Sequence, residues 1–252
     1  MITWERLRAR RPLLIAVSGI DGSGKSTLVE GLRERLGRNG YQVEVVWTRL
    51  EWTTLWESSG RLERIAALVN WLPARRRPAP AKSAPAEPSS AWLQPAPPRS
   101  AAAQLRRRSR LLTRAWASVV AAMHAQAQRN AVMPHLRDGK VVICDRYTLD
   151  AAVALHRRYD TVNSLGPQVR LMELLSPRPL LAWHLDVPAA VAAERKWDEL
   201  GIDERQRENV LYRRERERLG ARWLDASRPV DELVEQVTRE VEAALAGIAA
   251  GR

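Results

Sequence analysis

Cysteine is nearly absent from this chain of 252 residues, in which Cys144 is the only example. A single thiol excludes a disulfide framework and any zinc site built from several cysteines, and it fits a reducing, cytoplasmic compartment. Phenylalanine is absent altogether, yet hydrophobic residues still make up 45% of the chain. That share is close to the globular average, so we expect residues 1–252 to form one domain that needs no covalent staples.

Long hydrophobic runs are also absent from the sequence. The densest run near the N-terminus, residues 13–20, is too short to span a bilayer. It leads into Asp21, Gly22 and Lys25 and not into a small-residue cleavage site, so we expect neither a signal peptide nor a membrane anchor.

Acidic residues are scarce in one stretch of the chain. Residues 64–137 contain thirteen Arg or Lys and a single acid, Glu87, so this stretch carries the whole formal net charge of +12. A local excess of this kind suits either a solvated face or an anionic membrane surface, and the sequence leaves both open. It contains no motif typical of nucleic-acid-binding domains, so we do not expect nucleic acid as a partner.

Elsewhere, short apolar runs alternate with helical periodicities. The apolar runs predict strands at residues 13–18, 41–47, 141–145, 180–187 and 222–225. Helices are expected after the glycines that follow the first strand, and at residues 148–157, 167–175, 188–200, 203–219 and from 229 onward. This alternation predicts an α/β fold with a five-stranded parallel sheet that is flanked by helices on both faces.

Residues 73–100 interrupt this order, because they hold eight of the fifteen prolines and show no hydrophobic periodicity. We expect them to form a disordered or weakly ordered, proline-rich insertion. A short helix is expected before the insertion at residues 61–72, and a long arginine-rich helix is expected after it at residues 101–133.

The most specific motif is a glycine-rich loop. Residues 19–26, Gly-Ile-Asp-Gly-Ser-Gly-Lys-Ser, match G-x-x-x-x-G-K-[ST] between an expected strand and an expected helix. In such loops backbone N–H groups surround phosphate oxygens, the lysine reaches the β- and γ-phosphates, and the hydroxyl after it binds Mg²⁺. Asp145, at the end of an apolar strand, is the second Mg²⁺ ligand that we expect beside Ser26. The residues expected to bind ATP phosphates are Gly19, Gly22, Ser23, Gly24, Lys25, Ser26 and Thr27.

Three segments of the sequence together resemble the thymidylate kinase family of P-loop nucleoside monophosphate kinases. They are SGIDGSGKST at residues 18–27, Asp145-Arg146-Tyr147, and LDVPAAVAAERK at residues 185–196. The resemblance covers residues 13–51 and 139–245. It implies a three-layer P-loop kinase fold that uses ATP and Mg²⁺ to phosphorylate a nucleoside monophosphate, either dTMP or a related acceptor. Homodimers are common in the family, and the sequence leaves that state open here.

The resemblance also implies roles for individual residues. Asp21 would contact the sugar of the acceptor, Arg49 would hold its phosphate, and Arg146 would lie beside the transferred phosphoryl group. Arg195 would begin a short lid at residues 195–218, and Lys25, Arg146 and Arg195 would be the catalytic cations. Alternative lid cations are Lys196, Arg205 and Arg207.

The chain departs from the family's pattern at acceptor positions. Met123-His124 stands where the family usually has an Asp-Arg pair, and Leu155 stands where bacterial members often have a glutamine. Two alternatives therefore stay open: a kinase of a nucleoside or sugar hydroxyl, with Glu51 or Asp150 as the base, and an ATP-binding paralogue that transfers no phosphate. A nucleotide-dependent switch is disfavoured, because the sequence has no Asn-Lys-x-Asp segment.

Two aromatic residues near the expected site have alternative interpretations. Tyr147 is expected either to stack on the ring of the acceptor or to close the rim of the sheet. His184 lies inside an expected strand, and none of the histidines shows metal-ligand spacing. We therefore expect His184 to be packed and hydrogen-bonded.

Overall fold

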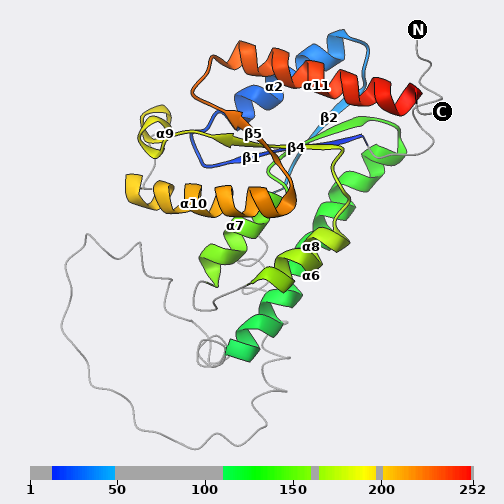
Figure 1. The fold of residues 1–252 in the computed structure, drawn as a ribbon. Helices are drawn as coiled ribbons and strands as arrows, with labels where there is room; N and C mark the ends of the chain where they lie inside the picture. Colours follow the sequence, from blue (N-terminus) through cyan, green and yellow to red (C-terminus); the bar gives the residue numbers. More distant parts are fainter. Residues whose placement is uncertain (1–12, 49–109, 160–164, 197–200, 251–252) are drawn as a thin grey trace, which may run out of the picture.

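Five parallel strands form the centre of the computed structural model, which describes residues 13–48, 110–159, 165–196 and 201–250 (Figure 1). Their order across the sheet is β2-β3-β1-β4-β5. This confirms the predicted five-stranded parallel sheet, and the strand ends lie within two residues of the predicted ones. The strands are β1 (Leu14–Gly19), β2 (Val43–Trp47), β3 (Val141–Asp145), β4 (Leu181–Asp186) and β5 (Arg222–Asp225).

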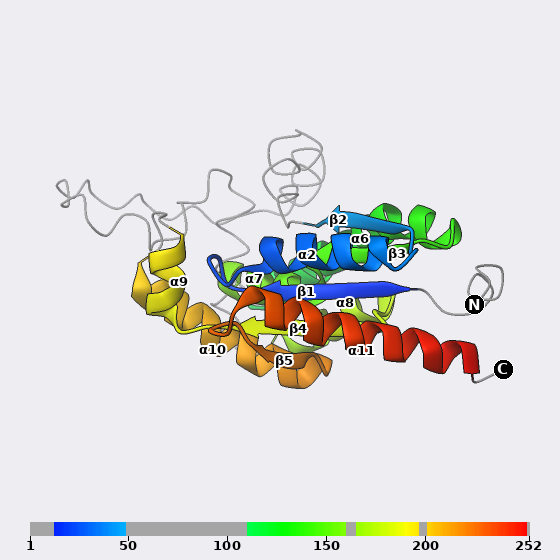
Figure 2. The ribbon, with the colours of Figure 1, turned by 90° about the horizontal axis from the view of Figure 1, so that it is seen from above.

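Helices cover both faces of this sheet, so the fold has three layers (Figures 1 and 2). One face carries α2 (Lys25–Arg38) and α11 (Val230–Ala250), which contact each other. The opposite face carries α6 (Arg110–Arg137), α7 (Thr148–Arg158), α8 (Gly166–Leu175) and α10 (Ile202–Leu219). A short helix, α9 (Ala189–Arg195), follows the carboxyl end of β4. The three-layer α/β arrangement is therefore confirmed.

Apolar side chains on both faces of the central strands explain why the sheet is buried. The residues of β1 and β3 are all buried, as expected for parallel strands that are covered by helices. Ile15, Val17 and Ile143 face the core beneath α2 and α11, whereas Leu14 and Cys144 belong to a smaller cluster. Burial raises the pKa of the Cys144 thiol, which packs there as a small hydrophobic side chain.

Small residues fill the contact between α6, α7 and α8. Ala117 and Ala121 of α6 and Ala152 of α7 are buried there with Met172 of α8. Leu155 belongs to the same cluster, where it is 1% exposed. Leu155 therefore supports the packing of these helices.

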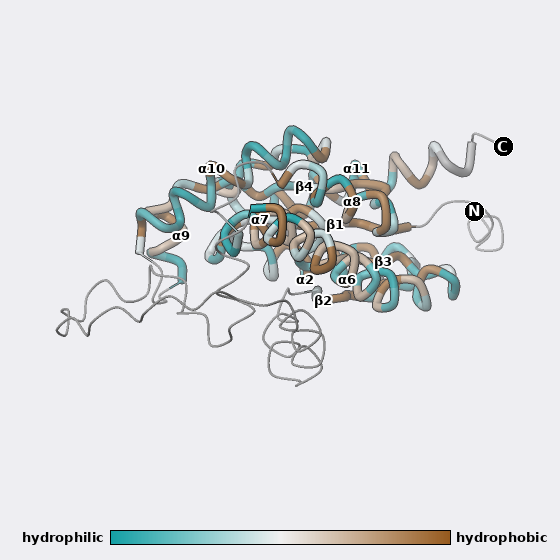
Figure 3. The backbone as a smooth tube through the Cα atoms, turned by 90° about the horizontal axis from the view of Figure 1, so that it is seen from below, coloured by the Kyte–Doolittle hydropathy of each residue, from teal (hydrophilic) through white to brown (hydrophobic). Residues whose placement is uncertain are grey.

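The helix α10 is more hydrophilic than the other described elements of the fold. The central strands β1 and β3 consist mostly of hydrophobic residues, whereas α10 is mostly hydrophilic (Figure 3). Its buried side chains are Arg205, Glu208, Asn209, Tyr212 and Glu215. This helix therefore packs through polar groups, and the partners of those groups lie at the candidate site.

Several predicted features lie outside the described residues. They are the helix at 61–72, the proline-rich insertion at 73–100, and the two residues Arg49 and Glu51. Of the predicted basic helix at 101–133, only the part from Arg110 is described, and α6 then continues through Pro134 to Arg137. The predicted helix at 188–200 is described over Ala189–Arg195. Within the ranges that the structure describes, no helix has the length and apolarity needed to cross a bilayer.

The contact between α2 and α11 gives a first prediction. A Cβ atom at Gly31 would lie 2.6 Å from Cγ2 of Val234, so the Gly31→Ala substitution overpacks this contact. Overpacking costs about 1–3 kcal/mol, and the better helix propensity of alanine offsets about 1 kcal/mol of that cost. We expect Gly31→Ala to stabilise a Val234→Ala background and to be neutral or destabilising in the wild type. Urea denaturation of the four proteins measures the coupling, and equal effects in both backgrounds would contradict the predicted contact.

Candidate functional site

The glycine loop, defined here as residues 19–26, connects β1 to α2 at the edge where all five strands end. Strands on both sides of β1 follow later in the chain, and ligands of such sheets bind beyond this edge. Gly22 and Gly24 have φ angles of 87° and 88°, which side chains rarely adopt. A Cβ atom at Gly22 would lie 2.2 Å from the carbonyl oxygen of Ala192 in α9. Glycine at this position therefore allows α9 to approach the loop.

The ammonium group of Lys25 points back into the glycine loop. Its Nζ donates hydrogen bonds to the carbonyl oxygens of Gly19 at 2.8 Å and Ile20 at 2.6 Å. Burial and the nearby charge of Arg146 lower the pKa of Lys25 to about 8. Lys25 is only 5% exposed and begins α2, whose positive N-terminal end adds to its charge. A buried ammonium group at a helix N-terminus is suited to binding an anion.

Ser26 and Asp145 form the next part of the site. The Ser26 hydroxyl donates a hydrogen bond of 2.9 Å to Oδ2 of Asp145. The other carboxylate oxygen, Oδ1, is buried and has no hydrogen-bond partner among the described residues. The structure thus brings together the two residues that the sequence predicted as Mg²⁺ ligands.

A magnesium ion fits the chemistry of this pair. Mg²⁺ binds hard oxygen ligands and usually keeps several positions for water or substrate phosphates. One hydroxyl and one carboxylate with a free oxygen satisfy that preference. Across the ranges that the structure describes, no group of three or more His, Cys, Asp or Glu side chains is placed to hold a metal ion.

Arg146 lies between the glycine loop and the end of β3. Its φ angle of 73° is unusual for a residue with a side chain. The Arg146 N–H donates to the Val17 carbonyl at 2.9 Å, and its carbonyl accepts a 2.6 Å hydrogen bond from the Thr48 hydroxyl. The Arg146 guanidinium donates to Asp21 Oδ1 and lies 3.9 Å from Asp150 Oδ1. The bonds of the Arg146 backbone to Val17 of β1 and to Thr48 after β2 therefore fix the direction of the Arg146 side chain.

Asp21 is surrounded by positive charge. Lys196 donates a 3.1 Å hydrogen bond to its Oδ2, and Lys25 lies 3.9 Å from its Oδ1. Burial alone would raise the pKa of Asp21, but the charges of Arg146 and Lys25 and the hydrogen bonds from Lys196 and Arg146 hold it well below its usual range. Burial alone would lower the pKa of Arg146, but the negative charges of Asp150 and Asp21 raise it above its usual value. Both groups are therefore ionised at neutral pH.

Asp150 is bonded on both of its carboxylate oxygens. Oδ2 accepts the Tyr147 N–H at 2.9 Å, at the start of α7. Oδ1 accepts the Tyr212 hydroxyl at 2.8 Å and lies 3.4 Å from the Gly19 nitrogen. This geometry makes Asp150 a link between α7, α10 and the glycine loop, and its alternative role as a base for a hydroxyl acceptor stays a prediction.

The polar face of α10 is bonded to the same region. Arg205 is 1% exposed and donates hydrogen bonds to the carbonyl oxygens of Asp21 at 2.7 Å and Lys196 at 3.1 Å. Asn209 donates to the Val187 carbonyl at 2.8 Å, beyond the end of β4. These contacts fix α10 against the glycine loop, and Arg205 contacts the backbone of the loop directly.

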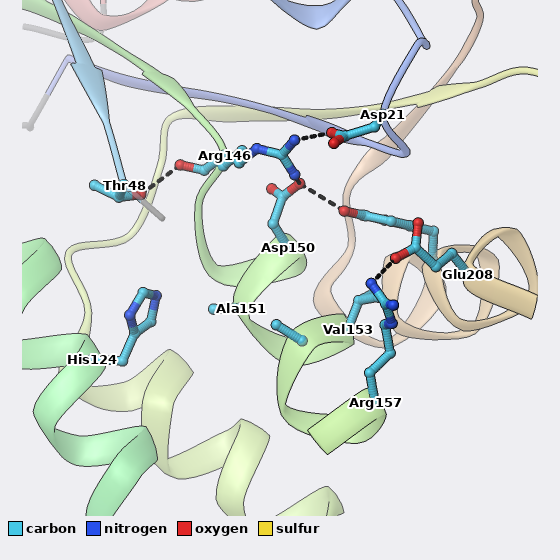
Figure 4. A pocket seen from close by; sticks show the side chains of 11 residues that line it. Asp21, Thr48, His124, Arg146, Asp150, Ala151, Val153, Arg157 and Glu208 are labelled. Atoms are coloured by element: carbon cyan, nitrogen blue, oxygen red, sulfur yellow. Dashed lines mark hydrogen bonds and ion pairs between the residues drawn. The ribbon is translucent and has the colours of Figure 1, made fainter. Parts of the chain in front are cut away.

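A pocket of about 190 Å³ opens beside this network, between α6, α7 and α10 (Figure 4). Asp21, Thr48 and Arg146 lie at its end nearest the glycine loop, and His124 of α6 points into it from the opposite side. Its remaining lining residues are Asp150, Ala151, Val153, Ala154, Arg157, Glu208 and Tyr212.

Two acids of α10 hold Arg157 at the far end of the pocket. Arg157 donates hydrogen bonds to Glu204 and Glu208. Burial raises the pKa of Glu208, and Arg157 opposes that rise. His124 is buried, and burial lowers its pKa to about 4, so its ring is neutral at pH 7.

Other predicted residues have contacts away from the pocket. The Tyr147 ring is 1% exposed in the core, and its hydroxyl donates to the Pro177 carbonyl at 2.8 Å, which favours the rim-closing alternative. Arg195 donates to the Ala226 carbonyl at 2.8 Å, after β5. Arg207 is exposed on α10. The predicted roles of Arg195 and Arg207 as lid cations stay predictions, as do the acceptor-binding roles of Arg49 and Glu51 outside the described residues.

The expectation for His184 is half right. The ring is fully buried and stacks on Tyr212, with centroids 5.2 Å apart and an interplanar angle of 6°. The expected hydrogen bonds are wrong, because neither ring nitrogen has a partner among the described residues. Burial lowers the pKa of His184 to about 4, so the ring stays neutral.

Sequence reasoning missed the contribution of α10 to the pocket. Glu208 and Tyr212 were not singled out, because α10 lacks an apolar stripe. A signal was present: Arg205, Glu208, Asn209 and Tyr212 recur at helical spacing on one face. Polar residues that follow the helical period can therefore mark a buried functional face.

No family model and no curated protein matches the chain.

The two glycines with positive φ provide a matched pair for a prediction. Gly22→Ala and Gly24→Ala both place a side chain on a residue in the left-handed backbone conformation, and this strain costs about 1–2 kcal/mol for each substitution. Only the side chain added at Gly22 would collide with a neighbour, because nothing lies within 4 Å of a Cβ atom at Gly24. We expect Gly22→Ala to lower the free energy of unfolding by about 1–3 kcal/mol more than Gly24→Ala does. Equal losses in chemical denaturation would contradict the close approach of α9.

Proposed function

We propose that this protein is an ATP-dependent phosphotransferase that moves the γ-phosphoryl group of ATP to an acceptor in the pocket beside the glycine loop. The observation that carries the proposal is the Ser26–Asp145 pair, with its unpartnered carboxylate oxygen, next to the enclosed ammonium group of Lys25. The arrangement supports binding of a phosphate chain together with Mg²⁺.

Lys25 would bind the β- and γ-phosphates of ATP. Its ammonium now donates to two carbonyl oxygens of the glycine loop, and phosphate oxygens would replace these acceptors. A phosphate oxygen carries negative charge whereas a carbonyl oxygen is neutral, so the Coulomb attraction to the ammonium group favours the exchange. Ser23 Oγ is buried without a partner among the described residues, so it is a further donor for phosphate.

Ser26 and Asp145 would hold the magnesium ion. When bound, Mg²⁺ neutralises charge on the β- and γ-phosphates and helps to orient them. Asp145 lies at the end of β3 and directly precedes Arg146, so β3 positions both residues.

Transfer requires little covalent help from protein groups. An acceptor oxygen forms a bond to the γ-phosphorus, the bond from that phosphorus to its bridging oxygen breaks, and ADP leaves with the electron pair. Lys25 and Arg146 would stabilise the charge of the phosphoryl group in transit. Arg195 would add a cation on the assumption that it leaves the Ala226 carbonyl.

The hydrogen bonds of Asp150 bear on the choice of acceptor. A hydroxyl acceptor benefits from a free base, whereas an acceptor phosphate is already ionised. Both oxygens of Asp150 are occupied by N–H or O–H donors, so it is a poor base in this arrangement. This favours a phosphate acceptor, in line with the resemblance to nucleoside monophosphate kinases. A hydroxyl acceptor would depend on Glu51, outside the described residues.

The role of Lys25 predicts the behaviour of a matched pair of variants. We expect Lys25→Met to lower ATP turnover by at least about 10²-fold, because it removes a cation from the transferring phosphates. Lys140→Met is the control, since Lys140 pairs with Glu44 before β3 and lies outside the site. The assay measures ADP release from ATP·Mg²⁺ with a panel of nucleoside monophosphates, nucleosides and sugars.

The outcomes of this assay separate the alternatives. Turnover that survives in Lys25→Met would overturn the proposed function. ADP·Mg²⁺ binding to the wild type without turnover on any acceptor would favour the non-catalytic paralogue. Selective turnover of a nucleoside would point to the hydroxyl kinase.

The depressed pKa of Lys25 predicts proton uptake on nucleotide binding. At pH 8 about half of the free protein has a neutral Lys25, and bound phosphates favour the charged form. ADP·Mg²⁺ binding should therefore take up to about half a proton at pH 8 and weaken as the pH rises further. Calorimetry in two buffers with different ionisation enthalpies measures the uptake. At pH 6.5 Lys25 is already charged, so equal uptake at both pH values would contradict the assignment.

A further inference from the structure

Among the described residues that line the pocket, His124 has both of its buried ring nitrogens without a hydrogen-bond partner. Its side chain points from α6 into the pocket and is 4% exposed (Figure 4). Buried polar groups without partners lower stability, so one that faces a pocket is suited to a ligand that supplies the missing bond.

The charges of the pocket show what kind of group can lie beside His124. Arg157 is bonded to Glu204 and Glu208, and Arg146 is bonded to Asp21. Both arginines that line the described pocket are therefore paired with carboxylates. The neutral imidazole offers one N–H donor and one nitrogen acceptor, so the end near His124 is suited to an uncharged polar group.

Shape narrows the choice of ligand further. Ala151, Val153 and Ala154 of α7 form an apolar wall of the pocket. A volume of about 190 Å³ is smaller than the roughly 300–1,000 Å³ of pockets for drug-sized molecules. The pocket therefore holds about one ring, with the rest of the ligand extending toward Arg146 and the glycine loop.

We propose that the pocket binds the acceptor by an uncharged ring with hydrogen-bonding groups, and that His124 is a specificity-determining residue that bonds to this ring. The proposal rests on the proposed function, because the reacting end of the acceptor lies toward Asp21 and Arg146. A nucleobase and a monosaccharide share this chemistry, and the experiment distinguishes them.

The test compares two variants of His124 with a control on the same helix. His124→Leu fills the space but forms no hydrogen bond, and His124→Gln keeps a neutral donor and acceptor. Gln126→Leu is the control, because Gln126 is exposed on α6 and bonds only to Asn130 in the described contacts. Each protein is tested for thermal stability, ADP·Mg²⁺ affinity and kinetics with ATP.

The acceptors cover both sources of a ring. They are the five common nucleosides, their monophosphates, glucose and ribose. For any that shows no turnover, binding to the ADP·Mg²⁺ complex is measured by calorimetry. Turnover or binding confined to nucleosides and nucleotides identifies a nucleobase, and confinement to the sugars identifies a sugar ring.

We expect His124→Leu to raise the KM of the preferred acceptor at least tenfold while ADP·Mg²⁺ affinity stays within twofold of the wild type. His124→Gln should recover part of the loss, and Gln126→Leu should match the wild type. His124→Leu should not lower the melting temperature, because it removes an unsatisfied polar group; a histidine with only a structural role would show the opposite pattern.

Other outcomes would overturn the inference. An acceptor KM that is unchanged in His124→Leu, or a matching loss of ADP·Mg²⁺ affinity, excludes the proposed role of His124. Failure of the wild type to bind or turn over any of these acceptors, with ADP·Mg²⁺ still bound, excludes the ring-binding pocket and also favours the non-catalytic paralogue. Turnover that depends on Lys25 but is unchanged in His124→Leu excludes only the role of His124. Failure to bind ADP·Mg²⁺ at all would instead contradict the proposed function.

Discussion

The arrangement of the site depends on one buried carboxylate, that of Asp150. Its partners come from separate parts of the chain: the N–H of Tyr147 at the start of α7, the Tyr212 hydroxyl of α10, and the Gly19 nitrogen at the end of β1. A buried carboxylate is costly unless such partners surround it. Each of these elements is therefore held in place by satisfying the same charge. A shift of α10 or of the glycine loop would leave part of this charge unpaired, so the two are expected to move together.

Polar packing of α10 extends this constraint. An apolar helix face can slide over a sheet at small cost, whereas hydrogen bonds have preferred directions and distances. Arg205 and Asn209 bond to backbone carbonyls beyond the ends of strands, so they fix the rotation of α10 about its axis. The same rotation carries Glu208 and Tyr212 to the pocket. The helix that supports the glycine loop thus also forms one side of the pocket, and a single packing arrangement sets both.

Local patterns in the sequence predicted the sheet, and long-range contacts formed most of the site. The strands and the glycine loop are legible because apolar runs, glycine spacing and the Lys25-Ser26 pair act within a few residues. The Ser26–Asp145 pair followed from the motif and from the parallel sheet, which brings strand ends to one edge. Asp150 and Tyr212 are 62 residues apart, and nothing in their local sequence predicts that they bond. His124 stood out only as a departure from a family pattern. Its unpartnered ring nitrogens become visible only when α6 is packed beside α7.

The backbone of Arg146 is strained, and this strain lowers the stability of the fold at the site. A side-chain-bearing residue with a φ of 73° is strained by about 1–2 kcal/mol, and the bonds from Arg146 N–H to Val17 and from Thr48 to its carbonyl hold it there. This conformation directs the guanidinium between Asp21 and Asp150. On the proposed function, a transferring phosphoryl group has to compete with these carboxylates for the same donors. The carboxylates thus weaken binding of Arg146 to the ground-state phosphate. Arg146 would contribute most where its donors fit the charge spread over the equatorial oxygens of the transition state.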